Sequence, residues 1–170
     1  MAAKNCNIDY FWRNYNGEIP ADAYSPGIDE KGVITYIGQA FIEERPGVYP
    51  TAIRPGKPII TSIDGPREVS NFVQILCTKH AGCFKWLQTD ATNLHKVTKN
   101  HHPIIAGIEE GGHLYIGKLT KDGEMIIGKI LAGHTFNAMM WFPHKNCEHC
   151  ASSFEVLIFD SDNFENVDLK

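Results

Sequence analysis

Short apolar stretches, separated by residues that favour turns, recur along the whole chain. Residues 33–42 (VITYIGQAFI) and 113–119 (HLYIGKL) are rich in β-branched and aromatic side chains and carry no helix cap. The 9 prolines and 15 glycines are spread along the chain, as in proteins with many turns between short strands. This pattern predicts an all-β fold. Residues 89–102 are polar and weakly patterned, and we expect a loop there.

The order of motifs in the first half of the chain returns in the second half. Residues 27–32 (GIDEKG) lead into residues 36–39 (YIGQ), and residues 107–112 (GIEEGG) lead into residues 115–118 (YIGK). Further matches in the same order are Trp12 with Trp86, residues 53–57 with 130–134, and residues 72–76 with 154–158, which pairs Phe72 with Phe154. Matching blocks in one order indicate a duplication. The sequence therefore predicts two pseudo-symmetric antiparallel β modules, over residues 10–80 and 84–160.

Two features of each predicted module stand where a ligand could approach. Asp29 and Glu109 follow a glycine at the mouth of a predicted turn, where short polar side chains bond to their own backbone. Gly38 and Gly117 lie inside predicted strands, where a missing side chain allows another backbone or a ligand to come close, or marks a bulge. The residues themselves leave these alternatives open.

Charge and composition exclude some classes of partner. A net charge of −4 and a pI near 6.0 give no broad basic surface, so we expect no nucleic-acid partner. No stretch approaches the ~20 apolar residues of a membrane-spanning helix, so we expect no membrane insertion. The first nine residues contain no apolar core of a signal peptide, which predicts a cytoplasmic protein, although non-classical release would leave no trace in the sequence. Five cysteines at uneven spacing favour reduced thiols over a disulfide framework.

The repeated blocks resemble the DM9 repeat family. The first half carries Trp12, residues 17–20 (GEIP), 27–29 (GID), 36–38 (YIG), 53–56 (IRPG) and 72–76 (FVQIL) in the order of that family. The resemblance is most specific where residues 115–118 (YIGK) are followed by residues 123–129 (GEMIIGK). It implies an antiparallel tandem-repeat fold, often a homodimer, with mannose-type glycan recognition in lectin-like members. It also implies a pattern-recognition or infection-response role. The residues place no serine or cysteine nucleophile in an elbow and no Gly-rich phosphate loop before a helix, so we expect no enzymatic activity.

The resemblance assigns the sugar contacts to an acidic residue after the glycine turn and to the lysine of the Gly-Lys element. In this chain these positions are Asp29 in the first module, and Glu109 with Lys129 in the second. The lysine position of the first module is occupied by Ala52. A carboxylate accepts hydrogen bonds from sugar hydroxyls while an ammonium group donates them, so the two together form a complementary grip. We therefore expect Glu109 and Lys129 to be the main site and Asp29 a weaker one, unless Glu109 and Lys129 form only an ordinary salt bridge.

Aromatic rings also contribute to sugar sites, because the C–H face of a pyranose packs against them. Tyr36, Tyr115 and Trp141 are candidates on this ground. Large aromatic residues more often fill a core, so we assign these three to the core.

The residues 144–150 (HKNCEHC) are the main rival signal for chemistry. Zinc would need a second pair of ligands, and Cys77 and Cys83 are separated by more residues than is usual. The Cys147-x-x-Cys150 spacing is also that of a redox pair, but it lacks the βαβ setting of such motifs. We predict no metal, no cofactor and no catalytic residues. The remaining alternatives are an intracellular interaction or stress-response scaffold with a degenerate sugar site, and a zinc or redox role at Cys147 and Cys150.

Overall fold

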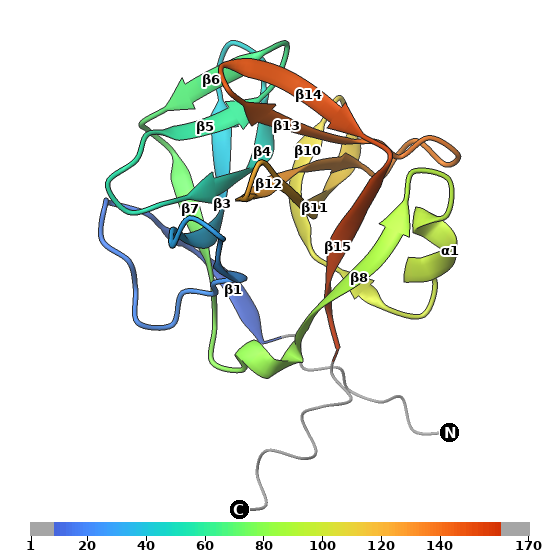
Figure 1. The fold of residues 1–170 in the computed structure, drawn as a ribbon, viewed down its shortest axis with the longest axis horizontal. Helices are drawn as coiled ribbons and strands as arrows, with labels where there is room; N and C mark the ends of the chain where they lie inside the picture. Colours follow the sequence, from blue (N-terminus) through green and yellow to red (C-terminus); the bar gives the residue numbers. More distant parts are fainter. Residues whose placement is uncertain (1–8, 161–170) are drawn as a thin grey trace, which may run out of the picture.

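The computed structural model describes residues 9–160, and Cys6 with the rest of the opening segment lies outside this range. Within it, the chain forms short strands with one turn of 3-10 helix and one short α-helix (Figure 1). The strands of the first half are β1 (Tyr10–Asn14), β2 (Gly27–Ile28), β3 (Ile34–Ile42), β4 (Gly47–Ile53), β5 (Ile59–Ser62), β6 (Pro66–Val69) and β7 (Val73–Thr78). Those of the second half are β8 (Phe84–Asp90), β9 (His102–Pro103), β10 (Ile105–Glu109), β11 (Gly112–Lys121), β12 (Glu124–Leu131), β13 (Met140–His144), β14 (Cys147–Ala151) and β15 (Ser153–Phe159). The predicted all-β class is confirmed, and the named strands pair antiparallel.

The segment 89–102, expected to be a loop, is partly regular. Strand β8 continues to Asp90, and the helix α1 (Leu94–Thr98) follows it. The Asp90 carboxylate accepts hydrogen bonds from the backbone N–H of Thr92 at 2.8 Å and of Asn93 at 2.9 Å, which folds the chain into the turn that precedes the helix. Leu94 is fully buried and anchors the helix to the core. A five-residue helix with a single anchor leaves too little periodic signal to be read from the sequence.

The pairing pattern of the first set of strands recurs in the second. β7 pairs with β1 and β3, and β3 with β4; likewise β15 pairs with β8 and β11, and β11 with β12. The hairpin β5–β6 has its counterpart in the hairpin β13–β14. Trp12 lies opposite Leu76, and Trp86 lies opposite Leu157 at the corresponding place. The two halves of the chain thus share one order of strands.

The strand pairing aligns β7 with β15, but it differs by one residue from the sequence match of residues 72–76 with 154–158. Ile75 lies opposite Gly38, and Val156 lies opposite Gly117. Counting back two residues from each, Phe154 corresponds to Val73 and not to Phe72.

Phe72 itself stands outside the core. It precedes β7 with a positive φ of 55°, and its side chain is 73% exposed. Phe154 is buried, as is Val73. The match between Phe72 and Phe154 is therefore wrong. Both residues are phenylalanines near the start of corresponding strands, so the sequence aligns them although the strand register pairs Phe154 with Val73.

The two sets of strands are joined into one structure. β4 of the first set pairs with β10 of the second, where Ile108 lies opposite Val48, so that thirteen strands form one sheet. The hairpin β5–β6 forms a separate two-stranded sheet and lies beside β13 and β14 (Figure 1). The module boundaries at residues 80 and 84 stay a prediction. No helix in the described range is long and apolar enough to cross a membrane.

Turns of each half also contact turns of the other half through ion pairs. Lys31 Nζ lies 2.7 Å from the carboxylate of Glu124, and Arg45 lies 3.8 Å from Glu110. Each contact joins a basic residue of the first half to an acidic residue of the second half, so the two ion pairs help to hold the halves together.

Three apolar clusters make up the core. The central cluster takes matching residues from both halves, among them Ile37 with Ile116 and Leu76 with Leu157, and each of the other two belongs mainly to one half. Gly38 and Gly117 face such packing, since a Cβ at Gly38 would meet the Ile53 side chain at 2.8 Å. The two glycines thus make room for neighbouring core side chains, and neither a bulge nor a ligand is involved.

Candidate functional site

Successive side chains of β12 point to opposite faces of the sheet, and this alternation brings Lys129 to the surface of a cavity. Lys129 and Leu131 point to the cavity, while Ile130 between them is buried in a core cluster. Lys129 lies opposite Ile116 on one side and opposite Trp141 on the other. Its counterpart in the first half is Ala52, which lies opposite Ile37. The strand register thus places Ala52 in the first half where Lys129 stands in the second, as expected from the sequence.

Glu109 and Lys129 point at one another and form a bidentate ion pair. Lys129 Nζ donates to both carboxylate oxygens of Glu109, at 2.8 and 2.9 Å. The pair is largely shielded, with side-chain exposures of 7% for Lys129 and 17% for Glu109. Lys129 Nζ also lies 5.3 Å from the centre of the Tyr49 ring. Burial, with the carboxylate of Glu109 nearby, raises the pKa of Tyr49 to about 12, so its hydroxyl stays protonated and donates to the backbone oxygen of Arg45.

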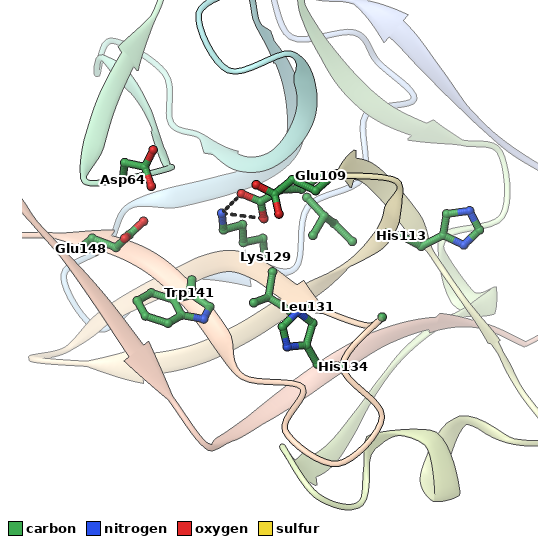
Figure 2. A pocket seen from close by; sticks show the side chains of 12 residues that line it. Asp64, Glu109, His113, Lys129, Leu131, His134, Trp141 and Glu148 are labelled. Atoms are coloured by element: carbon green, nitrogen blue, oxygen red, sulfur yellow. Dashed lines mark hydrogen bonds and ion pairs between the residues drawn. The ribbon is translucent and has the colours of Figure 1, made fainter.

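This ion pair lies in the wall of a cavity of about 470 Å³. Figure 2 shows the Glu109–Lys129 pair with Trp141, Leu131 and His134 below it in this view, all of them lining the cavity. The polar and aromatic lining includes Asp64, Glu109, Glu110, Lys129, Trp141 and Glu148. The volume is in the range of small-molecule sites, and the lining is richer in charged side chains than is usual for such sites. Asp64 comes from the first half of the chain, so both halves contribute to the lining.

Two further residues line the cavity: Trp141, a sequence candidate that we assigned to the core, and Glu148, which the sequence did not single out. The residues of β13 alternate between buried and half-buried, and Trp141 falls on the half-buried face together with Pro143. Pro143 lies opposite Glu148 in β14, so Trp141 and Glu148 are diagonal neighbours on one face of the hairpin. The assignment of Trp141 to the core is therefore wrong. The aromatic ring of Trp141 was the signal that made it a candidate, and the alternation within residues 140–144 does not say which face meets a cavity.

The other two aromatic candidates pack as predicted. Tyr36 lies against the core cluster of the first half and Tyr115 against that of the second. Neither belongs to the lining of the cavity.

Asp29, the site predicted in the first half, has a different environment. Its carboxylate oxygen accepts hydrogen bonds from the backbone N–H of Lys31 and Val33, both at 2.9 Å. Burial alone would raise the pKa of Asp29, but backbone hydrogen bonds from Val33, Lys31 and Met125 together lower it. The carboxylate thus stabilises the turn that carries it, and the structure does not bring it together with Glu109 and Lys129.

Comparison of the sequence with models of known families identifies a family for this chain. A family model described as the DM9 repeat matches residues 45–151, more than half of the chain, and it runs across the predicted module boundary. The chain belongs to the DM9 repeat family. The search of curated proteins returned no match.

A solved structure shares the fold of this DM9 chain. It is the crystal structure of the nematode sperm cell motility protein MFP2B, with a TM-score of 0.56 and 15% sequence identity over 88% of this DM9 chain. The matched region is 45% of that protein, so this chain spans about half its length. At this identity the likeness concerns the fold alone.

A second, smaller cavity of about 200 Å³ lies at the position in the first half of the DM9 chain where Ala52 replaces the lysine. Arg54, the residue after the end of β4, lines the same cavity, and its guanidinium donates to the backbone oxygen of Met125 at 2.5 Å. Burial lowers the pKa of Arg54 below its usual value, and the nearby carboxylates of Glu124 and Asp29 offset part of this effect. Asp29 is not part of the lining.

The four cysteines in the described part of this DM9 chain form no disulfide with one another. Cys147 lies opposite His144 and Cys150 lies opposite Trp141, so the two thiols point to opposite faces of β14. Cys77 and Cys83 are buried in different core clusters, and burial raises the pKa of Cys77 to about 11. Among residues 9–160, no three His, Cys, Asp or Glu side chains gather as metal ligands would. The zinc and redox alternatives thus gain no support from the geometry.

Proposed function

We propose that this protein binds a mannose-type glycan in the cavity around Glu109 and Lys129 and performs no catalysis there. The observation that carries the proposal is the bidentate ion pair, shielded from solvent yet lining a cavity of about 470 Å³. Carboxylate oxygens accept hydrogen bonds from sugar hydroxyls, and the third N–H of the ammonium group is free to donate to a ring or hydroxyl oxygen. Both charges strengthen the hydrogen bonds that they make.

The burial of the pair argues for a role beyond an ordinary surface salt bridge. Exposed pairs are common and contribute about 0–1 kcal/mol to stability. A pair with exposures of 7% and 17% has lost most of its hydration, which is an energetic cost that an apolar pair would avoid. A ligand with suitably oriented hydroxyl groups can replace the hydrogen bonds to water that the pair has lost on burial.

Trp141 adds an apolar surface to the polar pair. Its ring lies across the strand register from Lys129, on the same face of the sheet. A pyranose ring can therefore turn its C–H face to the indole while its hydroxyls reach Glu109 and Lys129. This combination of one aromatic surface and one charged pair fits a saccharide better than a wholly apolar ligand.

The tandem organisation and the Asp29 site belong to the same proposal. The recurring pairing pattern and the equivalent positions of Ala52 and Lys129 support a duplicated module. We infer that the copy with the lysine is the glycan site. Asp29 stays a weaker candidate, because Ala52 supplies no ammonium group and the carboxylate is engaged in its own turn. A pattern-recognition or infection-response role would follow from glycan binding.

Retention on mannan-agarose tests the proposal. We expect the wild-type protein to be retained and eluted by free mannose, and Lys129→Ala, checked for folding by far-UV circular dichroism, to flow through. Lys31→Ala is the matched control, since Lys31 forms an exposed ion pair outside the cavity. Flow-through of the wild-type protein, or unchanged retention of a folded Lys129→Ala variant, contradicts the proposed site.

A second candidate function is a protein-interaction scaffold that assembles as a homodimer. Three large apolar side chains are exposed near one another on β3, β10 and the residue before β7: Phe41, Ile108 and Phe72, with exposures of 40%, 49% and 73%. Phe41 and Ile108 both lie opposite Val48, and the centres of the Phe41 and Phe72 rings lie 6.1 Å apart. If a second copy covers these three side chains, the wild-type protein should have the mass of a dimer in solution and Phe72→Ser the mass of a monomer. A monomeric mass for the wild-type protein contradicts this candidate.

A further inference from the structure

The carboxylates around the Glu109–Lys129 cavity are unevenly compensated. Four of them line it, and three have a basic partner: Glu109 pairs with Lys129, while Asp64 at 2.9 Å and Glu110 at 3.8 Å share Arg45. Glu148 is the exception, since no Lys, Arg or His in the described range lies within ion-pair distance of it. Because Arg45 supplies one positive charge to two carboxylates, the cavity holds an excess of negative charge, and Glu148 is the lining carboxylate without a basic partner in the described range.

Glu148 is held in place by a neutral partner. Its carboxylate accepts a hydrogen bond from the hydroxyl of Ser62, a buried residue at the end of β5. This contact joins β14 to the first half of the chain and fixes the carboxylate without neutralising it. Figure 2 shows Glu148 on the Trp141 side of the cavity, below Asp64. A fixed carboxylate beside an indole face is an arrangement that attracts an ammonium group by both charge and cation–π attraction.

We propose that this cavity selects its sugar by charge: it prefers a hexosamine with a free ammonium group, accepts the neutral hexose and rejects the acidic sugar. The ammonium group lies between the carboxylate of Glu148 and the ring of Trp141, while Glu109 and Lys129 hold hydroxyl groups. A uronate brings its own carboxylate next to four others, and this repulsion weakens its binding. The inference rests on the proposed glycan site and specifies which sugars that site takes.

Calorimetric titration at about pH 7 and low salt with four sugars of one stereochemistry tests the inference. D-mannosamine carries an amine, which is charged for the most part at this pH as an ordinary α-amino group is. N-acetyl-D-mannosamine has the same substituent position without charge, D-mannose is neutral, and D-mannuronate is an anion. We expect mannosamine to bind about 5-fold more tightly than mannose, with the N-acetyl sugar near mannose and the uronate weakest, and we expect added salt to reduce the differences.

Two variants locate the effect. Glu148→Gln keeps a hydrogen-bond acceptor for Ser62 but removes the charge, so the ratio of mannosamine affinity to mannose affinity should fall to about 1. Glu18→Gln removes the same charge at an exposed position outside the cavity and should keep the preference. If mannose binds but mannosamine binds no more tightly, or if Glu148→Gln keeps the preference, the inference is wrong. If none of the four sugars binds the wild-type protein, the proposed function fails.

Discussion

Glu109 and Lys129 are the residues on which the account depends, and their pairing has a consequence for stability. Lys129→Met leaves the Glu109 carboxylate shielded and without its partner, so we expect the free energy of unfolding to fall by about 2–3 kcal/mol. Lys31→Met removes a pair with side-chain exposures of 50% and 36%, and its loss should be below about 1 kcal/mol. Urea unfolding of both variants measures the difference.

The double variant Lys129→Met with Glu109→Gln separates the lost pair from the lost packing. A neutral amide is less costly to shield than a carboxylate, so the second change should recover at least part of the loss. Equal losses for Lys129→Met and Lys31→Met would show that the pair is no more than a surface salt bridge.

At the residue scale, the sequence could supply only part of the site. Glu109 and Lys129 belong to two repeated motifs, so the resemblance identified them without knowledge of the fold. Trp141 and Glu148 depend on the register of β12 with β13 and of β13 with β14, which no motif records. Asp64 comes from the other half of the chain and depends on how the halves dock.

The elements around the site are held together where β10 meets β4. A Cβ on Gly107 would lie 2.0 Å from the backbone oxygen of Val48, and a backbone atom has little freedom to move away. We therefore expect Gly107→Ala to lower the free energy of unfolding by at least about 3 kcal/mol. Gly82→Ala is the matched control, because nothing lies within 4 Å of its Cβ, and its effect should stay within about 0.5 kcal/mol. A Gly107→Ala variant as stable as the control contradicts the close approach of the two strands.

The strands were predictable because each carries several apolar and β-branched residues in a row. Residues 33–42 and 113–119 coincide with β3 and β11 to within a few residues. The helix α1 and the alignment of Phe72 were not predictable in the same way. The helix depends on the side chain of Asp90 and on one buried leucine, and Phe72 occupies a positive φ that its residue type does not signal.

At the scale of the whole molecule, the halves share one sheet and a central core, so they should unfold together. Trp12 reports on the first half, and Trp86 and Trp141 report on the second. In a variant that keeps only Trp12, and in one that lacks only Trp12, tryptophan fluorescence and far-UV circular dichroism should give coincident urea transitions. A fluorescence transition that precedes the circular dichroism transition in either variant would mean that the halves unfold as separate domains.

The most direct test of the central claim is a titration of the protein with mannose, followed by the indole N–H signals in a ¹H–¹⁵N spectrum. The Trp141 signal, assigned with Trp141→Phe, should shift and saturate, because the ring borders the proposed sugar site. The signals of Trp12 and Trp86 should stay in place, because these rings pack against the central core and lie outside the cavity. No change of the Trp141 signal at about 50 mM mannose, well above a millimolar Kd, would contradict glycan binding at Glu109 and Lys129.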